Sequence, residues 1–337
     1  MPKTGTSSLQ HALFEGLKES RNAYYANLPT PNHSPQLFSL FHSHPEIHNV
    51  NLGKSEQEIE QYNKKNLKLL IDGFLRDERD IEIISGEDIF HIDEAGLLNL
   101  KEFLQTYFEK IIIVGYVRFL KSFMESSFQQ LVKYHFLNTL DESKIYPFYK
   151  NKLEKFDNVF GEKNVLLHIY EPKRFPDEDI TLDFCKRFNI DIEHDKKVTT
   201  NQSISKEAIS ILYTYNKRFL DSEVSKTDLM RVNRLVDMVS SIGDSRFRFS
   251  KNYIDKVVEK RRDDIEWIGI RLGERIDNID SETGIESEEE LLSISSDTIA
   301  EFKRHIMDKI KLDGEEFMKI KNSEDLGTIL DLVTHRL

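Results

Sequence analysis

Three short apolar runs, separated by longer amphipathic segments, constrain the fold of this chain most strongly. They are IEIIS (81–85), KIIIVGYV (110–117) and NVLLHIY (164–170). Short runs rich in Ile and Val are typical of buried strands, and the segments between these runs carry apolar residues at helical spacing. Strands that alternate with helices predict an α/β fold, in which helices cover both faces of a parallel sheet.

Helical spacing also predicts where the helices lie. Leu9, Leu13 and Leu17 recur along one face, which indicates a helix over residues 7–18. The segment 28–53 is rich in Pro, His and Asn, which predicts an irregular loop with a short helix. Further helices are expected at 55–75, 93–108 and 119–138, and the chain beyond Thr200 is expected to be mainly helical.

Charge divides the chain into two parts. The net charge is −12, but residues 276–337 hold 16 acidic and 7 basic residues, so residues 1–275 carry only −3. Gly284 and the acidic run ESEEE (286–290) predict a boundary between a domain over 1–275 and an acidic helical tail over 285–337. This balance argues against binding to duplex DNA and leaves room for a local basic pocket that binds a small anion.

Cysteine content and hydropathy indicate the compartment. The chain has one cysteine, Cys185, so it has no internal disulfide framework and no cysteine-based zinc cluster. No apolar run approaches the roughly 20 residues of a membrane span, and no signal peptide follows Met1. We therefore predict a cytoplasmic protein without a membrane span, and an anchor upstream of Met1 stays open as an alternative.

The first ten residues, MPKTGTSSLQ, contain a glycine loop that leads into a helix. Such a loop directs backbone N–H groups and the positive end of the helix dipole toward an anion, typically phosphate or sulfate. The pattern G-x-x-x-x-G-K-[ST] of common nucleotidases is missing. The candidate anion-binding residues are Lys3, Thr4, Gly5, Thr6, Ser7 and Ser8.

PKTGTSSLQ resembles the 5′-phosphosulfate loop of sulfotransferases that use 3′-phosphoadenylyl sulfate (PAPS), and it is most similar to the bacterial, carbohydrate-type branch. In that family the loop follows the first strand of a P-loop-like parallel sheet. The resemblance therefore implies the sulfotransferase fold for residues 1–275, with its first strand missing before Met1, followed by mainly helical structure. It further implies that Lys3 neutralises charge on the bridging oxygen of the donor.

A second resemblance follows the strand over 110–117. In the family, an Arg at the end of this strand and a Ser eight residues later bind the 3′-phosphate of the nucleotide. Arg118 and Ser126 stand at these positions here, although Phe119-Leu120 replaces the usual Asp/Asn-Pro. An arginine suits this role because its guanidinium can bind a phosphate through two hydrogen bonds.

The acceptor-activating residue is expected after the strand over 81–85. Bacterial relatives often read S-x-E there, and Ser85 and Glu87 match. A carboxylate at the carboxyl end of a parallel strand is well placed to act as a general base. Two alternatives stay open: Glu87 caps the next turn, or His33, in a region that faces the acceptor in the family, is the base instead.

Weaker resemblances extend to about residue 275. NVLLHIYE (164–171) is similar to a family strand that ends in Tyr-Glu, and TTNQSIS (199–205) is similar to an Asn-x-Ser segment that closes over the nucleotide. Asn201 and Ser203 are the matching residues, although a helix N-cap explains them equally well.

Taken with the family, these residues imply transfer of a sulfuryl group from PAPS to a hydroxyl of a saccharide-like acceptor, with adenosine 3′,5′-bisphosphate as the product. No metal is expected, because His33, His42, His44 and His48 do not follow the spacing of a standard metal site. Two alternatives remain: another P-loop transferase such as a small-molecule kinase, and a non-catalytic nucleotide-binding relative.

Overall fold

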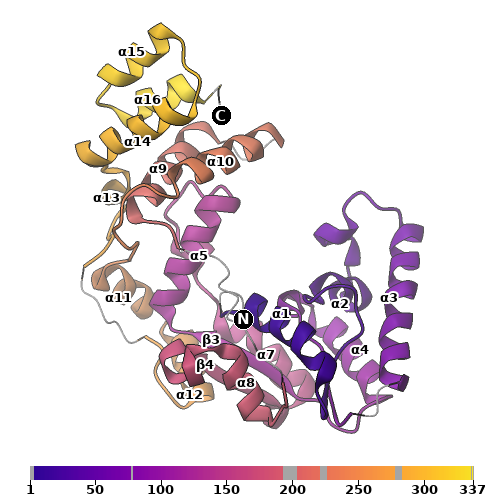
Figure 1. Cartoon of the computed structure of the whole chain (residues 1–337). Helices are drawn as coiled ribbons and strands as arrows, with labels where there is room; N and C mark the ends of the chain where they lie inside the picture. Colours follow the sequence, from indigo (N-terminus) through magenta and orange to yellow (C-terminus); the bar gives the residue numbers. More distant parts are fainter. Residues whose placement is uncertain are drawn as a thin grey trace. The chain divides into compact units, whose positions relative to one another are not determined.

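The chain forms two compact units, each built from segments that are separated in the sequence. The computed structural model describes residues 4–76, 79–192, 203–220, 226–277, 283–334 and 336 (Figure 1). The first unit contains Met1–Phe119, Phe148–Asn201 and Asp264–Ile276, and the second contains Leu120–Pro147, Gln202–Asp263 and Asp277–Leu337. The second unit contains the predicted tail 285–337 together with parts of the predicted domain 1–275. The division into these two domains stays a prediction.

The first unit contains four strands in two parallel pairs. Strand β1 (Ala23–Tyr25) pairs with β2 (Ile81–Ile83), and β3 (Ile113–Arg118) pairs with β4 (Val165–Tyr170). The last residues of β3 and β4 face each other in register. Parallel pairing and abundant helices confirm the predicted α/β class, and the parallel strands form two small sheets. The P-loop-like sulfotransferase sheet stays a prediction.

All three strands predicted from apolar runs are confirmed as β2, β3 and β4. Strand β1 was not predicted. Its three residues, AYY, are too few to show a period of two, and burial of Ala23 and Tyr25 in the core is what identifies them as a strand.

One hydrophobic core joins these strands to two helices. Helix α1 (Thr6–Gly16) contributes Leu9 and Leu13, and α8 (Ile180–Phe188) contributes residues from its buried face. Both pack with side chains from β1, β2 and β3. Tyr116 of β3 also donates a hydrogen bond of 2.7 Å to Asp183 of α8, so a buried polar contact reinforces this packing.

Other helices of the first unit pack against one another outside this core. Helices α3 and α4 meet through Phe74 and Phe103, whose ring centroids are 6.0 Å apart. The predicted loop over 28–53 contains α2 and two 3₁₀ turns, as expected for an irregular segment with a short helix. The bounds are α2 (Ser34–Phe41), α3 (Glu56–Arg76), α4 (Glu94–Gln105), α7 (Tyr149–Phe160) and α12 (Arg262–Leu272), with 3₁₀ turns η1 (Leu17–Glu19), η2 (Pro45–Ile47), η3 (Asn49–Asn51), η4 (Glu87–His91), η5 (Glu162–Asn164), η6 (Pro172–Arg174) and η7 (Pro176–Glu178).

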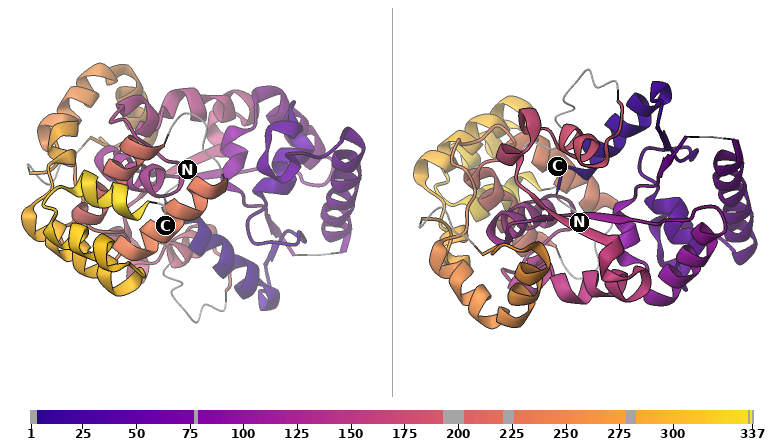
Figure 2. Two further views of the ribbon diagram at one scale, coloured as in Figure 1. Left: turned by 90° about the horizontal axis from the view of Figure 1, so that it is seen from above. Right: turned by 90° about the horizontal axis from the view of Figure 1, so that it is seen from below.

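The second unit is helical, which confirms the expectation for the chain beyond Thr200. Phe128 stacks on Phe247 at a centroid distance of 5.1 Å in its core. Helices α14, α15 and α16, drawn in yellow, lie side by side in both figures (Figures 1 and 2). The bounds are α5 (Leu120–Tyr134), α6 (Glu142–Ile145), α9 (Lys206–Phe219), α10 (Lys226–Val239), α11 (Lys251–Lys260), α13 (Glu288–Leu292), α14 (Ser296–Lys309), α15 (Gly314–Asn322) and α16 (Leu326–Val333).

Within the described parts of the chain, no helix combines the length and the apolar character that crossing a bilayer requires.

The sheets are small. Within the described residues each of the four strands pairs with one other strand, so each has one edge without a neighbouring strand. Residues 111–115, in the most apolar run of the chain, are only half-buried. Strands of parallel sheets are normally buried on both faces, and open apolar edges favour pairing with another strand.

The open edges generate a prediction about stability. We expect an apolar extension of about 5–8 residues, joined before α1, to raise the melting temperature, because it can pair with an open edge and cover apolar side chains. Differential scanning calorimetry would measure the change. A Gly/Ser extension of equal length is the control, and the same melting temperature for both extended chains would contradict the prediction.

Candidate functional site

Helix α1 begins with a glycine in the left-handed conformation. Gly5 has φ 70° and ψ 14°, and its carbonyl accepts the first helical hydrogen bond, from the N–H of Leu9 at 3.1 Å. Other residues are strained in this conformation, which explains the glycine in the loop. The first turn contains no acidic residue, and no side chain at Gly5 caps it. The first turn itself therefore places no carboxylate at the positive end of the helix dipole.

The loop lies against the carboxyl end of β4. A Cβ atom added at Gly5 would lie 3.2 Å from the hydroxyl oxygen of Tyr170, the last residue of that strand. Thr4 beside it is fully buried. The left-handed backbone and the nearby Tyr170 ring thus both favour glycine here.

Arg118 lies at the same end of the same sheet, where β3 and β4 finish. It ends β3, and it pairs in register with Tyr170. Its guanidinium carbon is 5.8 Å from the centroid of the Tyr170 ring, and its carbonyl oxygen accepts a hydrogen bond of 3.1 Å from Tyr149. Tyr170 therefore contacts both the glycine loop and the arginine, which the sequence separates by more than a hundred residues.

The segment after β2 is tied to α1. Gln10, a buried residue of α1, donates a hydrogen bond of 3.2 Å to the hydroxyl of Ser85. Gln10 lies five positions after Gly5, so the helix that begins at the glycine loop also holds the start of the Ser85–Glu87 segment. Glu87 is half-buried and begins η4. The two predicted segments therefore belong to one contiguous region of the first unit.

His33 packs on the other side of Ser85. Its backbone N–H donates to the carbonyl of Ser85 at 2.9 Å, and its Nδ1 accepts from the backbone N–H of Ser85 at 3.2 Å. An accepting Nδ1 requires the proton on Nε2 in the neutral ring. Burial lowers the pKa of His33 to about 4, so the ring is neutral at pH 7.

This geometry bears on the choice of base. Nε2 of His33 is buried and has no hydrogen-bond partner among the residues that the structure describes. Since that nitrogen carries the proton, His33 in this arrangement is a donor. The other predicted base, Glu87, is a carboxylate, and its role stays a prediction.

The roles of four predicted site residues stay predictions. Lys3 and Asn201 lie outside the described residues. Ser126 is a half-buried residue of α5, and Ser203 is exposed before α9; both belong to the second unit. Pairing of Arg118 with Ser126 around one phosphate stays a prediction.

Two residues that connect the site were not predicted as part of it. Tyr170 ends the strand NVLLHIY, and its signal was an aromatic residue at the same strand end as Arg118. Gln10 follows Leu9 on the buried side of α1. A polar side chain on a buried helix face needs a hydrogen-bond partner, and this was its signal in the sequence.

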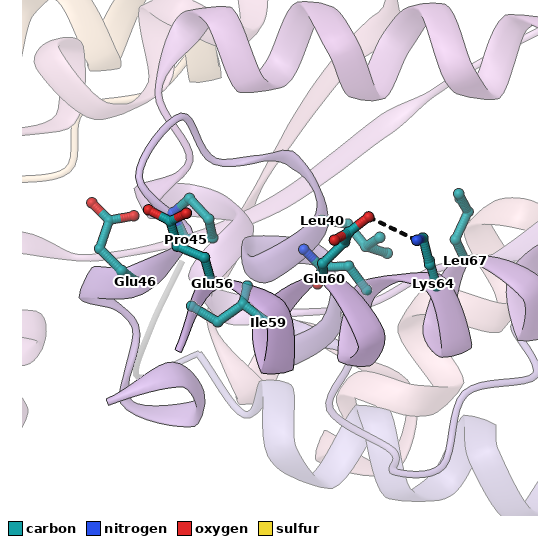
Figure 3. A pocket seen from close by; sticks show the side chains of 9 residues that line it. Leu40, Pro45, Glu46, Glu56, Ile59, Glu60, Lys64 and Leu67 are labelled. Atoms are coloured by element: carbon teal, nitrogen blue, oxygen red, sulfur yellow. Dashed lines mark ion pairs between the residues drawn. The ribbon is translucent and has the colours of Figure 1, made fainter. Parts of the chain in front are cut away.

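A groove in the same unit lies apart from these residues. Leu40, Pro45, Ile59 and Leu67 form its apolar lining, and it has a volume of about 480 Å³ (Figure 3). Glutamates from η2 and α3 also line it, and one of them, Glu60, forms an ion pair of 2.7 Å with Lys64. None of the predicted site residues lines this groove.

The loop histidines form pairwise contacts. His44 contacts Glu46 and His48 contacts Asp88, each at 3.2 Å. Among the described residues, no group of three or more His, Cys, Asp or Glu side chains is arranged to hold a metal ion.

The chain is 28% identical over 138 residues to an uncharacterized protein of Archaeoglobus fulgidus, and the match covers 40% of this chain and 38% of that protein. No protein-family profile matches the chain, and no solved structure matches it. The chain is thus similar to an archaeal protein over a minority of the length of each.

Proposed function

We propose that the chain is a PAPS-dependent sulfotransferase that sulfates a hydroxyl group of a saccharide-like acceptor. One observation carries the proposal: the glycine loop before α1, the Ser85–Glu87 segment and Arg118 lie in one region of the first unit, joined through Tyr170 and Gln10. These segments were selected separately from the sequence. Carboxyl ends of parallel strands are where open α/β sheets bind ligands, which also supports the proposal.

The chemistry of these groups suits a doubly anionic nucleotide. Backbone N–H groups at the start of α1 would hold the 5′-phosphate, and Arg118 would bind the 3′-phosphate that distinguishes PAPS from ATP. Lys3 would neutralise charge that grows on the bridging oxygen.

Glu87 would act on the acceptor. Its carboxylate would take the proton of the acceptor hydroxyl while the hydroxyl oxygen forms a bond to sulfur. The bond from sulfur to the 5′-phosphate oxygen breaks, and adenosine 3′,5′-bisphosphate leaves with that electron pair. PAPS supplies the sulfuryl group. In-line transfers of this kind depend mainly on orientation and charge stabilisation, which these side chains would provide.

The first prediction from this proposal concerns nucleotide binding. We expect adenosine 3′,5′-bisphosphate to bind much more tightly than AMP, and Arg118→Ala to weaken it by about 2–3 kcal/mol through loss of a charge-assisted bidentate contact. Isothermal calorimetry would measure both. Arg174→Ala is the control, because Arg174 already forms two hydrogen bonds of 2.7 Å with Glu274. Equal affinity for the two nucleotides, or tighter binding of ADP, would argue against the assignment.

The second prediction concerns Lys3. Because it acts on charge that develops in the transition state, Lys3→Ala should lower turnover by about 100- to 1000-fold, with a far smaller loss of nucleotide affinity. Steady-state assays with PAPS would measure turnover. Lys18→Ala, which removes an exposed lysine paired with Glu15, should leave it unchanged. Equal losses in both variants would show that general surface charge is responsible.

The third prediction concerns Glu87. Glu87→Gln keeps the shape and removes the base, so turnover on a sugar hydroxyl should fall by about 100- to 10,000-fold while nucleotide binding is retained. The loss should shrink with a nitrophenol acceptor, whose hydroxyl ionises readily. Normal turnover of this variant on a sugar would remove Glu87 from the mechanism and return His33 to consideration.

A further inference from the structure

The segment that carries Glu87 is a short 3₁₀ turn. Turn η4 contains five residues, and its N-cap, Gly86, makes no side-chain cap because it has no side chain. Short 3₁₀ turns have poorer hydrogen-bond geometry than α-helices, so their own bonds hold them weakly. The position of Glu87 therefore depends on contacts that other elements make with η4.

Helix α2 holds the beginning of the turn. The hydroxyl of Ser34 accepts a hydrogen bond of 2.9 Å from the backbone N–H of Asp88. A Cβ at Gly86 would lie 2.7 Å from the backbone nitrogen of Ser34, so the two backbones pack directly against each other. This contact fixes the residues on both sides of Glu87.

The turn η3 holds the side chain of Asp88. Nδ1 of His48 accepts from the N–H of Val50 at 3.1 Å, which leaves the proton on Nε2. Nε2 then donates to the carboxylate of Asp88 at 3.2 Å. The carboxylate next to Glu87 is thus engaged with a histidine and directed to one place.

Helix α7 holds the end of the turn through Lys155. Its Nζ donates to the carbonyl oxygen of Phe90 at 2.9 Å and to that of Ile92 at 2.5 Å. The last carbonyls of a helical turn have no partner within the turn, so one ammonium group satisfies two of them. Burial lowers the pKa of Lys155 to about 8, and the group is still mostly protonated at pH 7.

We propose that Lys155 is a positioning residue for Glu87. Its ammonium, anchored on α7, fixes the carboxyl end of η4 while Ser34 fixes the beginning, so the carboxylate of Glu87 is held where an acceptor hydroxyl can deliver its proton. The role rests on the proposed function. Reactive groups displaced by about 1 Å can lose about 100-fold in rate, so a residue outside the reacting atoms can control turnover in this way.

The test compares Lys155→Met with Lys101→Met. Lys101 also donates to a backbone carbonyl, that of Val159 at 2.7 Å, and this bond joins α4 to α7. With PAPS and a sugar acceptor, Lys155→Met should lower kcat by about 100-fold with little change in nucleotide affinity. Lys101→Met should stay within about twofold, since it leaves η4 in place.

Three further measurements separate positioning from a general loss of structure. The loss in Lys155→Met should shrink with a nitrophenol acceptor, and it should vanish when Glu87 is already Gln, because the two residues act through one step. Ser34→Ala, which releases the other end of the turn, should show the same dependence on the acceptor. This variant keeps the test decisive if Lys155→Met does not fold.

The outcomes distinguish the two proposals. Suppose that the unaltered chain transfers the sulfuryl group. Normal turnover of Lys155→Met, or an equal loss in Lys155→Met on the sugar and the nitrophenol acceptor, would then overturn the role of Lys155 and leave the proposed function intact. A full additional loss in the Glu87→Gln background would do the same. Absence of sulfuryl transfer by the unaltered chain would overturn both.

Discussion

Helix α1 is the element on which the candidate site depends, because it contacts the ends of both parallel sheets. At its start Gly5 packs against Tyr170 of β4, and one and a half turns later Gln10 hydrogen-bonds Ser85 after β2. Between these points its apolar face is part of the core shared with the strands. A rigid helix held at both contacts keeps two segments from distant parts of the sequence at a constant separation, which a loop could not do.

Local signals in the sequence were sufficient to predict most elements of the first unit. Apolar runs identified β2, β3 and β4, because Ile, Val and Leu gather where a strand packs into a core. The sequence also singled out Gly5, but its left-handed conformation is unusual before a helix and is seen only in the structure. Strand β1 was missed because three residues are too few to show the two-residue period of a strand. Only its burial against α1 and its pairing with β2 make it a strand.

The contacts that organise the site could not be predicted, because they join residues far apart in the chain. Nothing near Gln10 in the sequence indicates Ser85, and nothing near Lys155 indicates the carbonyls of Phe90 and Ile92. The protonation of His33 has the same origin. It follows from complete burial and from a donor at Ser85, and both are properties of the folded chain.

Burial also separates the roles of His33 and Glu87. Removing an imidazole from water penalises its charged form, which is why the pKa of His33 falls to about 4. A base that accepts a proton must hold the charge that results, and His33 would hold a positive charge in a fully buried site. A carboxylate becomes neutral when it accepts a proton, so the same step at Glu87 creates no positive charge. This difference between the two side chains is the reason to propose Glu87, and not His33, as the base.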